Sequence, residues 1–177
     1  MEDSVLIERF LRSGDLDAAE ELLGRYEQEL YNYLRQMLRH SQDSEDAMQE
    51  AFARALRALP RYREESHFKS WLFRIGHNEG LRIIQRRQRT VLQDEIEGGA
   101  DQSPDASTSA ELAERAKALH AAIELLPDHQ REVIALRQND IPFKEIAAIT
   151  GAPIGTVLAR MHKAKHRLRT LLEPILQ

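Results

Sequence analysis

Five basic side chains lie close together near the carboxyl end of the chain, where they could neutralise a polyanion. They are Arg160, Lys163, Lys165, Arg167 and Arg169. No Asp or Glu occurs between Glu145 and Glu173, although the whole chain has a formal net charge of -4. A basic surface without carboxylates suits phosphate contacts on nucleic acid. The alternative is a helix face that is merely solvated.

Two histidines in the same segment have a spacing that could bind a metal ion. His162 and His166 are four residues apart, which places two potential ligands on one side of a helix. Their neighbours Lys163 and Lys165 would repel a cation, and no carboxylate is near in sequence. We therefore expect no metal site, and we assign His162 to the DNA-binding face.

Carboxylates also recur at helical spacing earlier in the chain. Asp43, Asp46 and Glu50, with Gln49, lie along one side of a predicted helix. A paired-carboxylate catalytic site would need a histidine or a nucleophile, and none is placed to join it. A favourable interaction with the helix dipole accounts for the first two carboxylates but not for Gln49 and Glu50.

The elements that position these residues are predicted to be helices, because β-branched alternation between turn residues is hard to find. We expect an all-α chain with two small helical domains, residues 1–90 and 111–177. The linker between them, residues 91–110, has five acidic and no basic residues, with adjacent glycines and a proline. This composition is that of a solvated tether.

The first block contains three helical stretches. Residues 15–38 predict one or two helices with an apolar stripe of Ala19, Leu22, Leu23, Tyr26, Leu30, Tyr33, Leu34 and Met37. The next helix is capped by Asp43, ends at Pro60, and is expected to bury Met48, Phe52, Ala55, Leu56 and Leu59. The third covers residues 68–89, where Gly76 and Gly80 are expected to cost about 1 kcal/mol each relative to alanine.

The second block predicts helices over residues 110–126, 128–138 and 143–149, then a tight turn with Gly151 available for positive φ. A final helix begins near Ile154 and buries Val157, Met161, Ala164 and Leu168. Two helices joined by a short glycine turn, the second one basic, are typical of a helix-turn-helix. The side chains on the opposite face are Thr156, Arg160, Lys163 and Arg167. We therefore predict that this face binds DNA.

The compartment follows from composition and from the first residues. The chain has no cysteine, which fits a reducing compartment. The opening MEDSVLIERFLRSGD is charged throughout, unlike a signal peptide, and no later apolar run is long enough to cross a bilayer. We expect a cytoplasmic protein without membrane insertion.

Three segments together resemble bacterial sigma factors of the extracytoplasmic-function group. EIAAITGAPIGTVLARMHKAKHRLR is similar to the group's promoter-reading helix-turn-helix. DSEDAMQEAF resembles its Asp-x-x-Asp-x-x-Gln-Glu-x-Phe segment, and FKSWLFRIGHN resembles its Phe-x-x-Trp-Leu-x-x-Ile-x-x-Asn segment. The segments occur in the expected order and span nearly the whole chain.

This resemblance implies a non-catalytic subunit, without a cofactor, that binds core RNA polymerase and directs promoter-specific initiation. The first domain would bind the polymerase through Asp43, Asp46, Gln49 and Glu50. It would read and melt the minus-10 element through Tyr62, Arg63, His67, Lys69, Trp71, Arg74 and Asn78. Trp71 is otherwise most simply a core residue, whereas Asn78 suits capture of an unstacked base. The second domain would read the minus-35 element through Thr156, Arg160, His162, Lys163 and Arg167.

Several departures and alternatives stay open at this point. Leu158 and Ala159 stand where the group usually has a basic residue and serine, so the promoter sequence does not follow. A helix-turn-helix repressor or response-regulator output domain would leave the other two segments unexplained. A helical enzyme such as a metal-dependent hydrolase would need clustered ligands. The sequence does not decide whether an anti-sigma factor is a partner.

Overall fold

The computed structural model describes residues 2–63, 67–91 and 110–173, and every regular element in these ranges is helical. The chain divides into two compact units, Met1–Ala100 and Asp101–Gln177. The all-α prediction with two helical units is confirmed. The predicted linker lies almost entirely outside the described residues.

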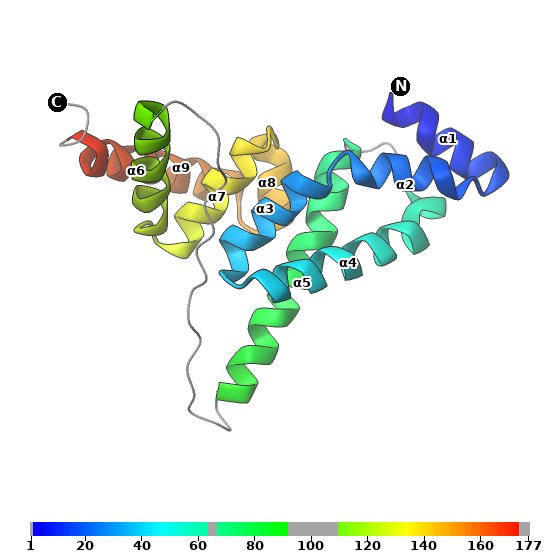
Figure 1. Ribbon diagram of the computed structural model, residues 1–177, viewed down its shortest axis with the longest axis horizontal. Coiled ribbons are helices and arrows are strands. Elements are labelled where there is room, and N and C mark those ends of the chain that lie inside the picture. The colour runs from blue at the N-terminus through cyan, green and yellow to red at the C-terminus, as the bar shows by residue number, and fades with distance from the viewer. Residues whose placement is uncertain (1, 64–66, 92–109, 174–177) are drawn as a thin grey trace. The chain divides into compact units, whose positions relative to one another are not determined.

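The described residues of the first unit form five α-helices (Figure 1). They are α1 (Asp3–Ser13), α2 (Leu16–Gly24), α3 (Glu27–Leu38), α4 (Ser41–Ala58) and α5 (Phe68–Val91). A single 3-10 turn, Leu59–Arg61, follows α4 and contains Pro60, as expected from a residue that cannot continue a helix. The helical prediction, which begins at residue 15, misses α1.

Helices α3, α4 and α5 pack against one another. Leu30, Tyr33 and Leu34 of α3 are buried, as the apolar stripe predicts. On α4 the prediction holds only in part: Ala55 and Leu59 are buried as predicted, but Met48, Phe52 and Leu56 are half-buried, and the helix buries Ala47 and Ala51 instead. Because α4 contacts both α3 and α5, its small residues occupy the inner face.

The two glycines of α5 allow a close approach to α3. A Cβ added at Gly76 would lie 2.7 Å from Leu30 Cδ1, and one at Gly80 would lie 2.7 Å from Met37 Sδ. Neighbouring side chains therefore occupy the space that alanine would need. The cost of the two glycines in helix propensity is offset by this close packing of α5 on α3, which the sequence did not reveal.

The second unit contains α6 (Ala110–Glu124), α7 (Asp128–Gln138), α8 (Phe143–Thr150) and α9 (Ile154–Leu172). Helix α9 packs on the other three. Val133, Ile146 and Val157 form part of the core of the second unit. Arg131 is buried and donates to the carbonyl oxygens of Glu124 and Leu126 at 3.1 and 3.2 Å, which satisfies two acceptors at the end of α6.

No helix in the described parts of either unit is long and apolar enough to span a bilayer.

Candidate nucleic-acid and polymerase interfaces

The connection between α8 and α9 has the predicted helix-turn-helix form. Gly151 follows α8 with φ 65°, the left-handed conformation that glycine adopts without a Cβ clash. Pro153 directly precedes α9, where its missing N–H removes no helical hydrogen bond. The turn thus fixes α9 against α8 with its inner side buried.

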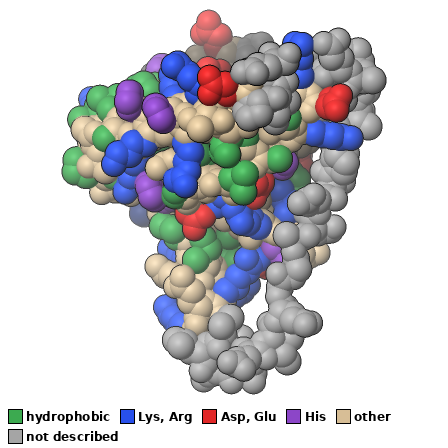
Figure 2. Space-filling model, turned by 90° about the vertical axis from the view of Figure 1, so that its left-hand side faces the viewer, with side chains coloured by type: hydrophobic (Ala, Val, Ile, Leu, Met, Phe, Trp, Pro, Cys, Tyr) green, Lys and Arg blue, Asp and Glu red, His purple; other side chains and the backbone are tan. Residues whose placement is uncertain are grey.

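The outer side of α9 carries the predicted DNA-binding residues. Val157, Met161 and Ala164 are buried, whereas Leu168 is half-buried. Thr156, His162, Lys163 and Arg167 are exposed, and Arg160 is half-exposed. Figure 2 shows basic and histidine side chains lying among exposed hydrophobic ones.

Arg160 differs from the other basic residues of α9 because a carboxylate of α7 interacts with it. Burial raises the pKa of Glu132 to about 7, Arg160 opposes this rise, and Asp128 adds to it. Glu132 was not among the predicted site residues. Its pairing depends on how α7 packs on α9, which sequence spacing does not reveal.

Four of the predicted minus-10 residues lie on or beside one side of α5. Trp71, Arg74 and Asn78 follow one another at spacings of three and four, with Arg74 and Asn78 exposed. His67, exposed, directly precedes the helix. Trp71 is half-buried, so the core interpretation and the binding interpretation each describe part of its surface.

An aromatic cluster lies at the start of this face. The ring of Tyr62 lies 5.0 Å from that of Trp71 and 5.7 Å from that of Phe68, measured between ring centroids. Phe68 and Trp71 are 5.4 Å apart in the same measure. The residue after Tyr62, Arg63, is exposed. The structure therefore brings an aromatic cluster beside exposed cationic groups, with Asn78 two turns further along α5.

Lys69 does not join this face. Its ammonium lies 2.7 Å from Glu29 Oε2 of α3 and near the rings of Tyr26 and Phe73, with centroid distances of 6.0 and 5.9 Å. In the helical register of α5 it lies on a different side from Trp71 and Asn78. The grouping of Lys69 with those residues is therefore not what the fold produces.

On α4 the predicted polymerase-binding residues have different environments. Asp46 and Gln49 are exposed, and Asp46 Oδ1 accepts a hydrogen bond from Gln42 at 3.1 Å. Asp43 is instead in an ion pair with Arg87 of α5, and its side chain is 18% exposed. The predicted cap is also wrong, because the helix begins earlier and the His40 ring accepts a hydrogen bond from the Asp43 N–H at 3.3 Å.

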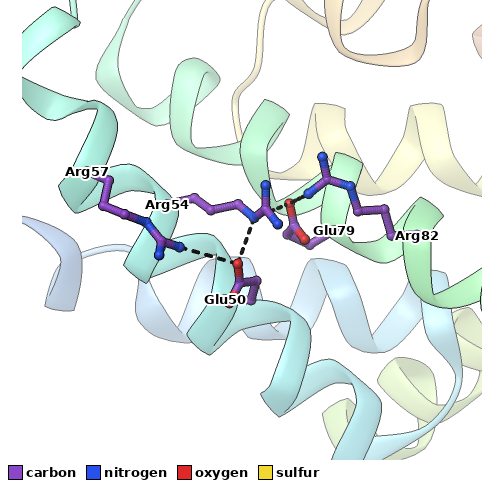
Figure 3. A network of polar contacts seen from close by, with 5 residues as sticks. All are labelled: Glu50, Arg54, Arg57, Glu79 and Arg82. Carbon is purple, nitrogen blue, oxygen red and sulfur yellow. Dashed lines mark hydrogen bonds and ion pairs between the residues drawn. The ribbon is translucent and has the colours of Figure 1, made fainter.

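Glu50 belongs to a network of charges that joins α4 to α5 (Figure 3). Arg54 Nε lies 2.8 Å from Glu50 Oε1 and 2.9 Å from Glu79 Oε1. Arg57 also reaches Glu50, at 3.3 Å, and Arg82 reaches Glu79, at 2.5 Å. Glu79 is 7% exposed and was not predicted, although its spacing of three from Arg82 was a weak signal for a pair.

His77 is a second buried polar residue of α5 that the sequence left unassigned. Its Nδ1 lies 2.8 Å from the hydroxyl of Tyr33 on α3. Burial lowers the pKa of His77 to about 4. A neutral imidazole is therefore part of the α3–α5 packing, directly beside the exposed Asn78.

His162 and His166 are both exposed on α9. Within the described residues no group of three or more histidines and carboxylates could hold a metal ion.

Known protein families and proteins match both units. Residues 22–90 match the family described as Sigma-70 region 2, and residues 116–168 match Sigma-70, region 4. The chain is 31% identical to the ECF RNA polymerase sigma-E factor of Escherichia coli K12, over 99% of this chain and 96% of that protein. It is 29% identical to the RNA polymerase sigma-H factor of Pseudomonas aeruginosa, with the same coverage.

Two solved structures have the same fold as this chain. The sigma factor RpoE of Bartonella quintana, in complex with the anti-sigma factor NepR, has a TM-score of 0.70 and 26% identity, covering 90% of this chain and 97% of that one. CnrH, in complex with the cytosolic domain of CnrY, has a TM-score of 0.66 and 26% identity, covering 97% of both chains.

Proposed function

The chain belongs to the extracytoplasmic-function group of RNA polymerase sigma factors, which direct promoter-specific initiation, and from this premise we propose which of its surfaces do so. Core RNA polymerase and promoter DNA are its partners. Residues 1–90 bind the polymerase and act on the minus-10 element. Residues 111–177 read the minus-35 element, and the segment between them is the linker.

The polymerase-binding surface is the outer side of α4. Asp46, Gln49 and Glu50 support this assignment because they lie within two turns of one helix and none is buried. The guanidinium groups of Arg54 and Arg57 hold the carboxylate of Glu50, so that it is oriented before the polymerase binds. Asp43 contributes indirectly, since its pair with Arg87 holds the start of α4 against α5.

The minus-10 surface consists of the aromatic cluster and the adjoining side of α5. Tyr62 and Trp71 offer rings on which an unstacked base can stack, and Asn78 offers an amide that can pair with a base edge. The cationic or partly cationic side chains beside them are Arg63, His67 and Arg74. Lys69 supports this surface by fixing α5 to Glu29 of α3.

The minus-35 surface is the outer side of α9, formed by Thr156, Arg160, His162, Lys163 and Arg167. One observation carries this assignment: no carboxylate occurs between Glu145 and Glu173, the interval that contains α9 and the tight turn at Gly151 before it. A helix that enters the major groove meets phosphates on both sides, so an acid-free basic face favours binding.

The protein has no catalytic activity of its own and acts in the cytoplasm, where its polymerase works. An anti-sigma factor is a further partner. This proposal is supported by the similar structure of the sigma factor RpoE, which is bound to the anti-sigma factor NepR.

The test is transcription by purified core polymerase, with and without this chain, on a library of genomic fragments. We expect transcripts from a small set of start sites only when the chain is present. Equal transcripts with and without it, on every template, would contradict the proposal.

A further inference from the structure

The first two turns of α9, which come before its basic residues, expose apolar side chains. Ile154 is 50% exposed and Leu158 is 46% exposed. They are four residues apart and therefore lie on the same side of α9, with His162 one turn further. Residues 146–159 contain no charged side chain. The recognition helix is thus uncharged over residues 154–159 and basic from Arg160 onward.

Packing within the unit does not explain these exposed side chains. Val157 and Met161 supply the contacts of α9 with the core, at 0% and 5% exposure. A Cβ added at Gly155 would meet no atom within 4 Å, and Ala159 is exposed. The exposed surface beside Leu158 is therefore formed by small residues, which lets another surface approach the helix closely.

The chemistry of the major groove offers one apolar partner for such a surface. The first turns of a recognition helix contact base edges. Every base edge in that groove carries hydrogen-bonding groups, but thymine alone adds a methyl group. A leucine cannot donate or accept a hydrogen bond, so its favourable contact there is with this methyl group.

We propose that Leu158 determines promoter specificity by packing against the 5-methyl group of a thymine in the minus-35 element, the upstream element of the promoter. Ile154 extends the same apolar contact. This inference rests on the proposed function, in which α9 lies in the major groove. Lys163 and Arg167, further along the helix, supply the phosphate attraction, and Leu158 supplies discrimination between bases.

The experiment uses holoenzyme made from the full chain and core polymerase. A promoter is first selected from a random-sequence library by holoenzyme binding. Each thymine of its upstream element, on either strand, is then replaced by deoxyuridine, which removes only the methyl group. We expect one or two of these replacements to weaken wild-type binding about fourfold, the effect of leaving one methyl-sized group unburied.

The Leu158→Ala holoenzyme should bind the selected promoter correspondingly less well and should be insensitive to the same deoxyuridine replacements. Leu119→Ala is the matched control, because Leu119 of α6 is 40% exposed and undergoes the same truncation. It should keep both the affinity and the deoxyuridine sensitivity of the wild type. Circular dichroism should show equal helix content in both variants.

The methyl contact would be overturned if Leu158→Ala kept the wild-type sensitivity to deoxyuridine, if no replacement had an effect, or if the selected element contained no thymine. Failure of the proposed function has a different result. Scrambling the upstream element would then leave binding unchanged, and Lys163→Ala would have no effect. If scrambling and Lys163→Ala both weaken binding while deoxyuridine does not, only the methyl contact is wrong.

Discussion

Arg160 and Lys163 are both on the outer side of α9, but their surroundings give them different expected roles. Lys163 is exposed, whereas Arg160 is half-exposed and interacts with Glu132. A planar guanidinium is suited to pairing with a guanine edge, and a mobile ammonium is suited to phosphate.

We therefore expect Lys163→Ala to weaken binding of all upstream sequences alike. The slope of log K against the logarithm of the salt concentration should become shallower by about one. Arg160→Ala should cost roughly 1–3 kcal/mol on the preferred sequence and relax discrimination at one base pair. Arg160→Lys is the matched control, because it keeps the charge beside Glu132 and removes the planar fork. Band shifts of holoenzyme on upstream duplexes at several salt concentrations measure these effects. Equal losses on all sequences for both alanine variants would contradict the assignment.

His77 makes the first unit sensitive to acid. Its pKa in the folded protein is about 4, below the ordinary value of 6.5, so the unfolded chain binds this proton first as pH falls. The stability associated with neutral His77 is present above pH 6.5 and is lost on going down to pH 4, by roughly 3 kcal/mol.

Urea unfolding followed by the fluorescence of Trp71, the chain's single tryptophan, reports on this unit. His77→Gln keeps a side chain that can hydrogen-bond to the Tyr33 hydroxyl and does not titrate. Between pH 6.5 and pH 4 the free energy of unfolding should fall more for the wild type than for this variant. A difference that stays constant with pH would show that His77 is not buried as described.

At the scale of elements, the contact between α3 and α5 depends on Gly76. Alanine there would place a methyl group against Leu30, which is fully buried and has little room to move. We expect Gly76→Ala to lower the free energy of unfolding by about 1–2 kcal/mol, because overpacking exceeds the gain in helix propensity. Gly80→Ala should cost less, since Met37 is half-buried and flexible.

Gly24→Ala is the control for these substitutions. A Cβ at Gly24, the last residue of α2, meets no atom within 4 Å, so alanine there should be neutral or slightly stabilising. Thermal or urea unfolding of the three variants measures the order. If Gly76→Ala were as stable as Gly24→Ala, the close approach of α3 and α5 would be wrong.

The outer side of α4 gives a second prediction at this scale. Asp46→Ala combined with Glu50→Ala should weaken binding to core polymerase and leave the helix content unchanged, because both side chains lie outside the packed face. Asp17→Ala combined with Glu20→Ala removes the same charge from exposed positions of α2 and should keep wild-type affinity. A pull-down with core polymerase compares them, and an unchanged affinity of the α4 variant would refute the assigned surface.

At the scale of the whole molecule, the two units are expected to act in different steps of initiation. Asn78→Ala should leave binding of the upstream duplex unchanged and impair promoter opening, because its proposed partner is a base already out of the stack. Arg160→Ala should weaken duplex binding first. Band shifts on the upstream duplex and permanganate footprinting of the minus-10 region separate the two steps. Normal opening with Asn78→Ala together with normal binding by Arg160→Ala would reject both sites.

The sequence by itself determined the helices of the second unit and the order of the functional segments. The helical stretch over residues 128–138, the turn at Gly151 and the start of the last helix agree with the structure, because proline and glycine act within a few residues. The resemblance to sigma factors was carried by the same local patterns.

Tertiary structure alone decided which polar side chains are paired and which small residues are buried. Ala47 and Ala51 face inward only because α4 packs on both α3 and α5. Glu79 is joined to Arg54, and Lys69 to Glu29, across helix pairs distant in sequence. Periodicity describes the sides of one helix. Which side a second helix covers, and so the burial, charge and pKa of residues such as His77 and Glu132, depends on contacts between helices that spacing along the chain does not contain.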